Sequence, residues 1–143
     1  MGSEMCIRDR DRVRKLYANF IEAGSDLILT NTFGGTHFRL GLHDASDRVA
    51  ELNQRAAELA CDEVKKSGRD VLVAGSMGPT GEILQPNGPV STEEAMQSFR
   101  EQAEALVAGG VDVLWIETMS ARCLLYTSPS PRDLSTSRMP SSA

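Results

Sequence analysis

Two kinds of hydrophobic pattern alternate along the chain, and the alternation occurs three times. Apolar residues that recur every three or four positions predict amphipathic helices, and a short continuous apolar run follows each of them. We expect each helix to bury its apolar face. These faces consist of Val13, Leu16, Tyr17, Phe20 and Ile21; of Val49, Leu52, Ala56, Leu59, Ala60 and Val64; and of Ala95, Phe99, Ala103, Leu106 and Val107.

The apolar runs repeat one motif, in which Gly-x-Asp precedes three apolar residues. The copies GSDLIL, GRDVLV and GVDVLW begin at Gly24, Gly68 and Gly110. The runs that begin in these copies, LILT, VLVAG and VLWI, are almost entirely apolar, which is typical of parallel strands that are buried on both faces. Repeated helix and strand units predict an α/β fold, either a (β/α)8 barrel or a doubly wound open sheet.

Local signals support these element boundaries. Ser91 and Glu94 have the spacing of a capping box at a helix start. Helix-to-strand connections are short, whereas long connections follow the first two strands, and in both architectures ligands bind at that end of the sheet. Glycines stand where a left-handed residue would end each helix, at Gly24, Gly68 and Gly109 or Gly110.

Composition limits the classes of protein. The 143 residues are enough for one ordinary domain, and 41% hydrophobic with 24% charged residues is typical of soluble globular proteins. No apolar stretch approaches the roughly 20 residues that cross a bilayer, and the start lacks the apolar segment of a signal peptide. We therefore predict a cytoplasmic protein without a membrane partner. A net charge of −5 with scattered Lys and Arg argues against nucleic-acid binding.

Polar residues follow each predicted strand, in TNTFGG (30–35), GSMGPTGE (75–82) and ETM (117–119). Because the carboxyl ends of parallel strands share one edge, we expect one polar cluster there. Thr30, Asn31 and Thr32 offer neutral hydrogen-bonding groups, and Glu117 offers a carboxylate for an ammonium group. The alternatives are turn chemistry for the first three and a solvated or capping role for the glutamate.

Other candidate residues favour structural roles. Cys6, Cys61 and Cys123 are too widely spaced for a disulfide framework or a metal knuckle, and Cys61 is expected to be a small buried hydrophobe. The glycines of GSMGPTG do not fit a phosphate-binding loop. His37 and His43 lie in the first long loop, where packing is favoured over acid–base chemistry. Three residues are expected to pack: Met77, Trp115 and Met119.

Residues 11–122 closely resemble the homocysteine S-methyltransferase family, and within it the bacterial betaine–homocysteine methyltransferases. The resemblance lies in AGSDLILTNTFGGTHFRLGLH, ELNQRAAELA, DVLVAGSMGPTGEIL and GGVDVLWIETMSA, which occur in family order. It implies a (β/α)8 TIM barrel, of which this chain has about three parallel strands with their helices. It also implies transfer of a methyl group from betaine or a similar donor to homocysteine, forming methionine.

The resemblance implies specific roles for residues. Glu117 would hold the amino group of homocysteine, and Thr30, Asn31 and Thr32 would line the amino-acid end of the pocket. Family members hold zinc through three cysteines in late G-x-N-C and G-G-C-C segments, and neither segment exists here. We therefore predict zinc in the parent protein, no metal ligand or catalytic residue in this fragment, and no activity of the fragment alone. The resemblance leaves open whether the parent protein is a homo-oligomer.

The two ends read differently from the core. MCIRDR, and CLLYTSPSPRDLSTSRMPSSA from Cys123 on, resemble translated sequencing-adapter sequence. We therefore divide the chain into an adapter-like segment (1–10), a barrel fragment (11–122) and an adapter-like disordered tail (123–143); a natural disordered tail is the alternative. Two other functions stay open: another TIM-barrel enzyme, or a non-catalytic half-barrel that binds amino acids or self-associates.

Overall fold

The computed structural model describes residues 10–119. The predicted order of helix followed by strand, three times, is confirmed. Within the first long connection the structure adds a short helix, α3, and a 3₁₀ turn, η1, which the sequence pattern did not predict. The predicted terminal segments, 1–10 and 123–143, lie outside the described residues except for Arg10, which begins α2. The elements are α2 (Arg10–Glu22), β1 (Leu27–Leu29), α3 (His37–Gly41), η1 (Ser46–Arg48), α4 (Val49–Ser67), β2 (Leu72–Met77), α5 (Thr92–Ala108) and β3 (Val113–Ile116).

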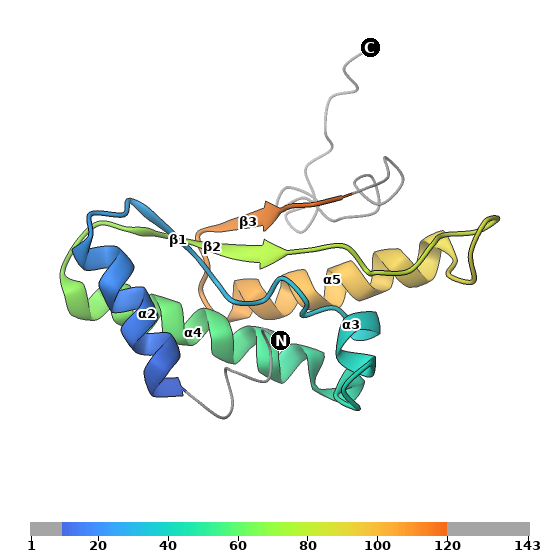
Figure 1. Ribbon diagram of the computed structural model, residues 1–143, viewed down its shortest axis with the longest axis horizontal. Helices are drawn as coiled ribbons and strands as arrows, with labels where there is room; N and C mark the ends of the chain where they lie inside the picture. The colour runs from blue at the N-terminus through green and yellow to red at the C-terminus, as the bar shows by residue number, and fades with distance from the viewer. Residues whose placement is uncertain (1–9, 120–143) are drawn as a thin grey trace, which may run out of the picture.

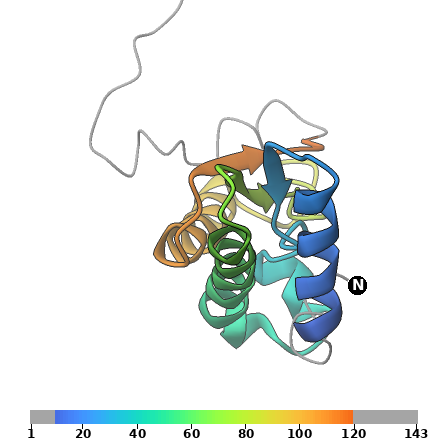
Figure 2. The ribbon, with the colours of Figure 1, turned by 90° about the vertical axis from the view of Figure 1, so that its left-hand side faces the viewer.

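The three strands form one parallel sheet in the order β1-β2-β3. Figures 1 and 2 show α2, α4 and α5 side by side beneath this sheet, all on the same face. The carboxyl ends of the strands point toward α3 (Figure 1). This arrangement confirms the predicted α/β class with parallel strands. No helix within residues 10–119 is both long and apolar enough to span a membrane.

The main core lies between the sheet and the helices. Ile28 and Val73, which are neighbours in the β1–β2 register, pack with buried residues of α2 and α4. Met77 at the end of β2 packs against Phe99 of α5, and both side chains are fully buried. Met119 is partly buried against the same cluster. The sequence predictions for Met77 and for most of the three apolar helix faces are therefore confirmed.

Some apolar positions were wrongly predicted as buried. Leu16 and Phe20 on α2 and Val107 on α5 are about half exposed. Within the described residues these two helices flank α4, and each packs on it from one side only. Their outer flanks therefore have no described neighbour to cover them.

The strands also depart from the prediction of burial on both faces. β2 is buried along most of its length, whereas side chains of β3 alternate between exposed and half-buried. Trp115, predicted to pack, is 46% exposed. The register places the exposed apolar side chains on the face opposite the helices, which we call the open face. Its exposed residues are Leu29, Leu72, Val113 and Trp115.

The predicted helix ends are largely confirmed. Ser91 and Glu94 form both hydrogen bonds of the capping box at the start of α5. Gly68 ends α4 in the left-handed conformation, with φ of 66°. After α5 the left-handed residue is Gly110, with φ of 93°, because Gly109 still has helical dihedral angles.

Candidate functional site

Hydroxyl groups connect the carboxyl ends of β1 and β2. The Ser76 backbone N–H donates to Thr30 Oγ1 (3.0 Å), and the Thr32 hydroxyl donates to the Ser76 carbonyl oxygen (2.7 Å). The two threonine oxygens lie 2.6 Å apart. Because the Thr32 hydroxyl already donates its proton to the Ser76 carbonyl oxygen, the Thr30 hydroxyl is the donor in the contact between the two threonines. All three residues are buried, so their hydrogen bonds are shielded from water.

Ser76 also contacts the carboxylate that follows β3. Its hydroxyl donates to Glu117 Oε1 at 2.6 Å, and the Glu117 backbone N–H donates to the Met77 carbonyl oxygen at 3.1 Å. Glu117 is half-buried, and in the described part of the chain its Oε2 has no hydrogen-bond partner. The next residue, Thr118, has a φ of 60°, which is rare for a β-branched residue. Glu117 is therefore held at one oxygen, while the other remains available to a cation.

We call Thr30, Thr32, Ser76 and Glu117 the rim network. Three of its members were predicted as site residues, whereas Ser76 was not singled out, although it lies in the quoted GSMGPTGE segment. The signal that could have identified it is a small polar residue within an otherwise apolar strand. The substrate-binding roles of Thr30, Thr32 and Glu117 stay predictions, but the structure does bring these residues together around Ser76.

The fourth predicted residue, Asn31, faces a different element. The buried Tyr17 hydroxyl on α2 donates to Asn31 Oδ1 (3.2 Å) and accepts from the Asn31 backbone N–H (3.1 Å). The asparagine side chain is therefore engaged by α2, apart from the rim network. This contact joins the segment after β1 to α2, and the substrate-binding role of Asn31 stays a prediction.

Close backbone approach brings the first two strand-end loops together. The Gly78 N–H donates to the Phe33 carbonyl oxygen at 3.1 Å. A Cβ atom at Gly78 would lie 2.7 Å from that same oxygen and from the Phe33 ring. Glycine is thus required here because a larger residue would force the two loops apart.

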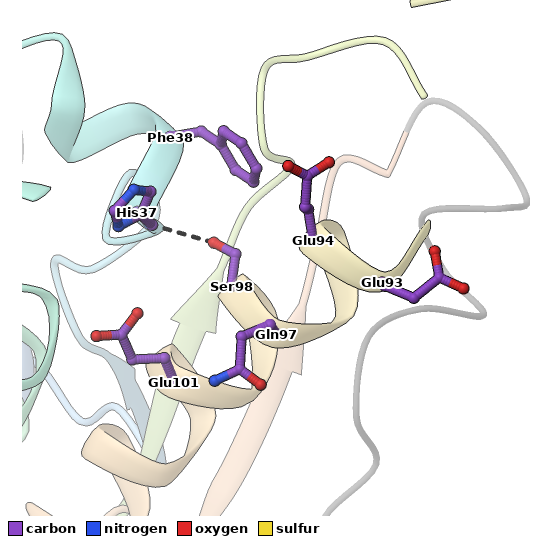
Figure 3. Close-up of a pocket in the computed structure, with 7 residues that line it drawn as sticks. All are labelled: His37, Phe38, Glu93, Glu94, Gln97, Ser98 and Glu101. Atoms are coloured by element: carbon purple, nitrogen blue, oxygen red, sulfur yellow. Dashed lines mark hydrogen bonds between the residues drawn. The ribbon is translucent and has the colours of Figure 1, made fainter. Parts of the chain in front are cut away.

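A pocket of about 450 Å³ lies outside the rim network, between α3 and α5. Figure 3 shows the Phe38 ring and His37 on one side and α5 side chains on the other, with the His37 backbone N–H donating to Ser98 Oγ (3.2 Å). The His37 ring packs edge-on against Phe38, with 5.9 Å between their centroids, consistent with the predicted packing role. The lining residues are His37, Phe38, Glu93, Glu94, Gln97, Ser98 and Glu101, so none of the predicted site residues is among them.

The described residues do not fit a zinc site. Within residues 10–119 no three His, Cys, Asp or Glu side chains gather where they could hold a metal ion. Cys61 is half-buried, its thiol donates to the Gly110 carbonyl oxygen (3.2 Å), and burial raises the pKa of that thiol. This raised pKa disfavours the thiolate that metals require. The other two cysteines, Cys6 and Cys123, lie outside the described residues.

Methionine synthases and a homocysteine methyltransferase of known structure are among the proteins that are similar to this chain. Methionine synthases from Mycobacterium tuberculosis and Mycobacterium leprae are 34% and 33% identical to it over 111 residues, which is 76% of this chain and 9% of each relative. The chain thus spans about a tenth of the length of these relatives. The homocysteine methyltransferase MmuM from Escherichia coli shares the fold at 20% identity, with TM-scores of 0.75 for its metallated form and 0.73 for its oxidized form.

The matched MmuM region covers 88% of this chain and 48% of MmuM. The fold of the described residues is therefore part of a TIM barrel, and the predicted choice of a barrel over an open sheet is confirmed. The profile of the family described as homocysteine S-methyltransferase matches residues 1–123. This chain accordingly belongs to the homocysteine S-methyltransferase family.

Proposed function

We propose that this chain supplies the amino-acid end of the substrate site in a methyltransferase that converts homocysteine to methionine. Family membership supports the reaction class, since the similar proteins are named methionine synthase and homocysteine methyltransferase. The observation that carries the proposal is the contact between Ser76 and Glu117, because it orients a carboxylate at the carboxyl end of the sheet. The cytoplasmic location stays a prediction.

The rim network can recognise an ammonium group. The Ser76 hydroxyl fixes Glu117 Oε1, and the free Oε2 can accept a charge-assisted hydrogen bond from the homocysteine amino group. Thr30 and Thr32 use their hydroxyl protons inside the network, so they hold Ser76 in place rather than bind the substrate through those protons. Recognition of the substrate therefore depends on a pre-oriented acceptor.

The sulfur chemistry requires groups that the described residues do not supply. We propose a zinc-dependent parent enzyme, in which bound zinc would keep the homocysteine sulfur as a thiolate at neutral pH. Residues 10–119 hold no ligand set for it. The proposal leaves three classes of methyl donor open: betaine, another sulfonium or ammonium compound, and a methylfolate bound by a separate domain. We expect the 143-residue chain by itself to show no methyl transfer with any of these donors.

Substitution of Glu117 in a longer protein that contains this segment tests the proposal. Glu117→Gln keeps the shape but removes the charge, so we expect homocysteine binding to weaken by about 1.5–3 kcal/mol, or roughly 10- to 150-fold in Kd. Calorimetric titration measures the Kd, and metal analysis should show unchanged zinc content. The matched control is Glu82→Gln, an exposed glutamate of the second strand-end loop. Equal affinity of the Glu117 variant and the control would contradict the proposal.

A non-catalytic, self-associating half-barrel is the second candidate, and the open face is the observation in its favour. Leu29, Leu72 and Trp115 expose apolar surface there, between 40% and 48% of each side chain. Exposed apolar sheet faces drive association. Sedimentation of the purified chain at several concentrations tests this function. A single dimer of defined size would support it, whereas a monomer or a heterogeneous aggregate would count against it.

A further inference from the structure

Two buried amide side chains meet behind the loop that follows β1. Asn53 of α4 is 1% exposed, and Gln102 of α5 is fully buried. Gln102 Nε2 donates to Asn53 Oδ1 at 3.2 Å, so the two amides connect the helices directly. Neither residue belongs to the rim network, and neither was predicted as functional from the sequence.

Each amide also holds one backbone carbonyl of the loop. Gln102 Nε2 donates to the Thr32 carbonyl oxygen at 2.7 Å, and Asn53 Nδ2 donates to the Gly35 carbonyl oxygen at 2.8 Å. Asn53 Nδ2 also donates to the Val49 carbonyl oxygen on its own helix (2.8 Å). The amide pair therefore fixes both ends of the segment 32–35.

The fit around Gly35 leaves no room for a side chain. A Cβ atom at Gly35 would overlap Asn53 Oδ1 and would lie 2.7 Å from Gln102 Nε2. Apolar residues would serve equally well for helix packing alone, because burying an amide is costly unless its hydrogen bonds are made. Among the described residues Gln102 Oε1 is buried without a hydrogen-bond partner, but the N–H groups of both amides donate to loop carbonyls, and this indicates that the role of the pair is to place the loop.

The loop leads directly into the rim network. Thr32, whose carbonyl is held by Gln102, donates its hydroxyl to the Ser76 carbonyl, and the Ser76 hydroxyl donates to Glu117. We propose that Asn53 and Gln102 are positioning residues that fix the 32–35 segment and, through Thr32 and Ser76, orient the Glu117 carboxylate for an amino-acid ammonium group. The ammonium part of this inference rests on the proposed function.

The test compares Gln102→Met with Gln97→Met in the 143-residue chain. Both changes remove an amide from α5 and retain a long unbranched side chain, but Gln97 is exposed. Amide hydrogen exchange, followed by mass spectrometry, measures the opening of residues 30–36 and of α2. The ¹³C chemical shift of the Glu117 carboxyl carbon reports its orientation, and titration with homocysteine reports affinity.

We expect Gln102→Met to raise the equilibrium constant for local opening of residues 30–36 by about 10-fold, because a hydrogen bond to a buried carbonyl is lost. Exchange in α2 should be unchanged. The Glu117 carboxyl signal should shift, and the homocysteine Kd should rise several-fold. The control should change none of these. Asn53→Leu should reproduce the exchange result from the other helix.

Several outcomes would overturn the inference. Equal exchange and an equal Glu117 signal in the Gln102 and Gln97 variants would remove the positioning role. Faster exchange throughout the chain would also overturn it, because the amides would then support the whole core rather than the loop. If the wild-type chain binds no homocysteine, the proposed function fails for this chain, while the exchange and carboxyl signals still decide the positioning role.

Discussion

The two faces of the three-stranded sheet carry similar apolar residues but have different surroundings. On the face that the helices cover, Ile28, Val73 and Met77 are at most 4% exposed. On the open face, Leu72 and Trp115 from the same sheet are 48% and 46% exposed. The apolar composition of a strand therefore reflects how many of its two faces are buried in the whole fold. In a TIM barrel the second face lines the packed interior, and this chain matches 48% of the MmuM chain.

The largest difference between the faces should appear when one aromatic residue is removed from each. Phe99 is fully buried against the sheet, so Phe99→Ala should lower the free energy of unfolding by about 3–5 kcal/mol. Trp115→Ala on the open face should cost about 1 kcal/mol or less, because its side chain is already half in water. Urea unfolding followed by circular dichroism measures both. Similar losses for the two variants would show that the open face is covered in solution.

A smaller effect is expected from the cap of α5, the helix that covers β2 and β3. The Ser91 hydroxyl accepts from the Glu94 backbone N–H at 3.2 Å. Ser91→Ala should lower the free energy of unfolding by about 1 kcal/mol, the usual contribution of such a cap. Thr92→Ala, at the next and exposed position, is the control and should have little effect. If both variants unfold at the same urea concentration, the capping box contributes nothing to the covered face.

The smallest effect should be a dependence of the same cap on pH. Hydrogen bonds from the Ser91 backbone N–H and hydroxyl lower the pKa of Glu94 below its ordinary value of 4.5. A lowered pKa in the folded state means that this contribution to stability is fully present above about pH 4.5 and is lost as pH falls through the folded pKa. Glu94→Gln should therefore flatten the pH dependence of unfolding below pH 4.5. An unchanged slope in the variant would assign the pH dependence to other carboxylates.

Local features of this fold could be predicted from the sequence. The capping box of Ser91 and Glu94 and the left-handed Gly68 depend on a few adjacent residues, and both are confirmed. The order of helices and strands follows from periodicity that extends over many residues. The helix α3 was missed because its five residues are too few to show a period. The exposure of Leu16 and Trp115 was missed because it depends on which elements lie beside them.

The candidate site was predictable only in part. Glu117, Thr30 and Thr32 were identified because polar residues after apolar strands gather at one edge, and the structure places them around one serine. Ser76 lay in the quoted GSMGPTGE segment but was not singled out, and the contact of Asn31 with Tyr17 was not predicted. Such partners come from distant segments, so only the folded chain reveals them.

The hydrogen bonds at Ser76 also have a consequence for strand pairing. Parallel strands made of nearly interchangeable Leu, Ile and Val residues can slip by one position, and a slip moves every side chain to the other face. Ser76 contacts Thr30 and Thr32 through its backbone and Glu117 through its side chain. A pairing of β2 and β3 shifted by one residue would place Gly75 or Met77 beside Glu117 instead, and neither has a hydroxyl to offer the carboxylate. The same serine that orients the carboxylate therefore distinguishes the correct alignment of the sheet from its nearest misaligned competitors.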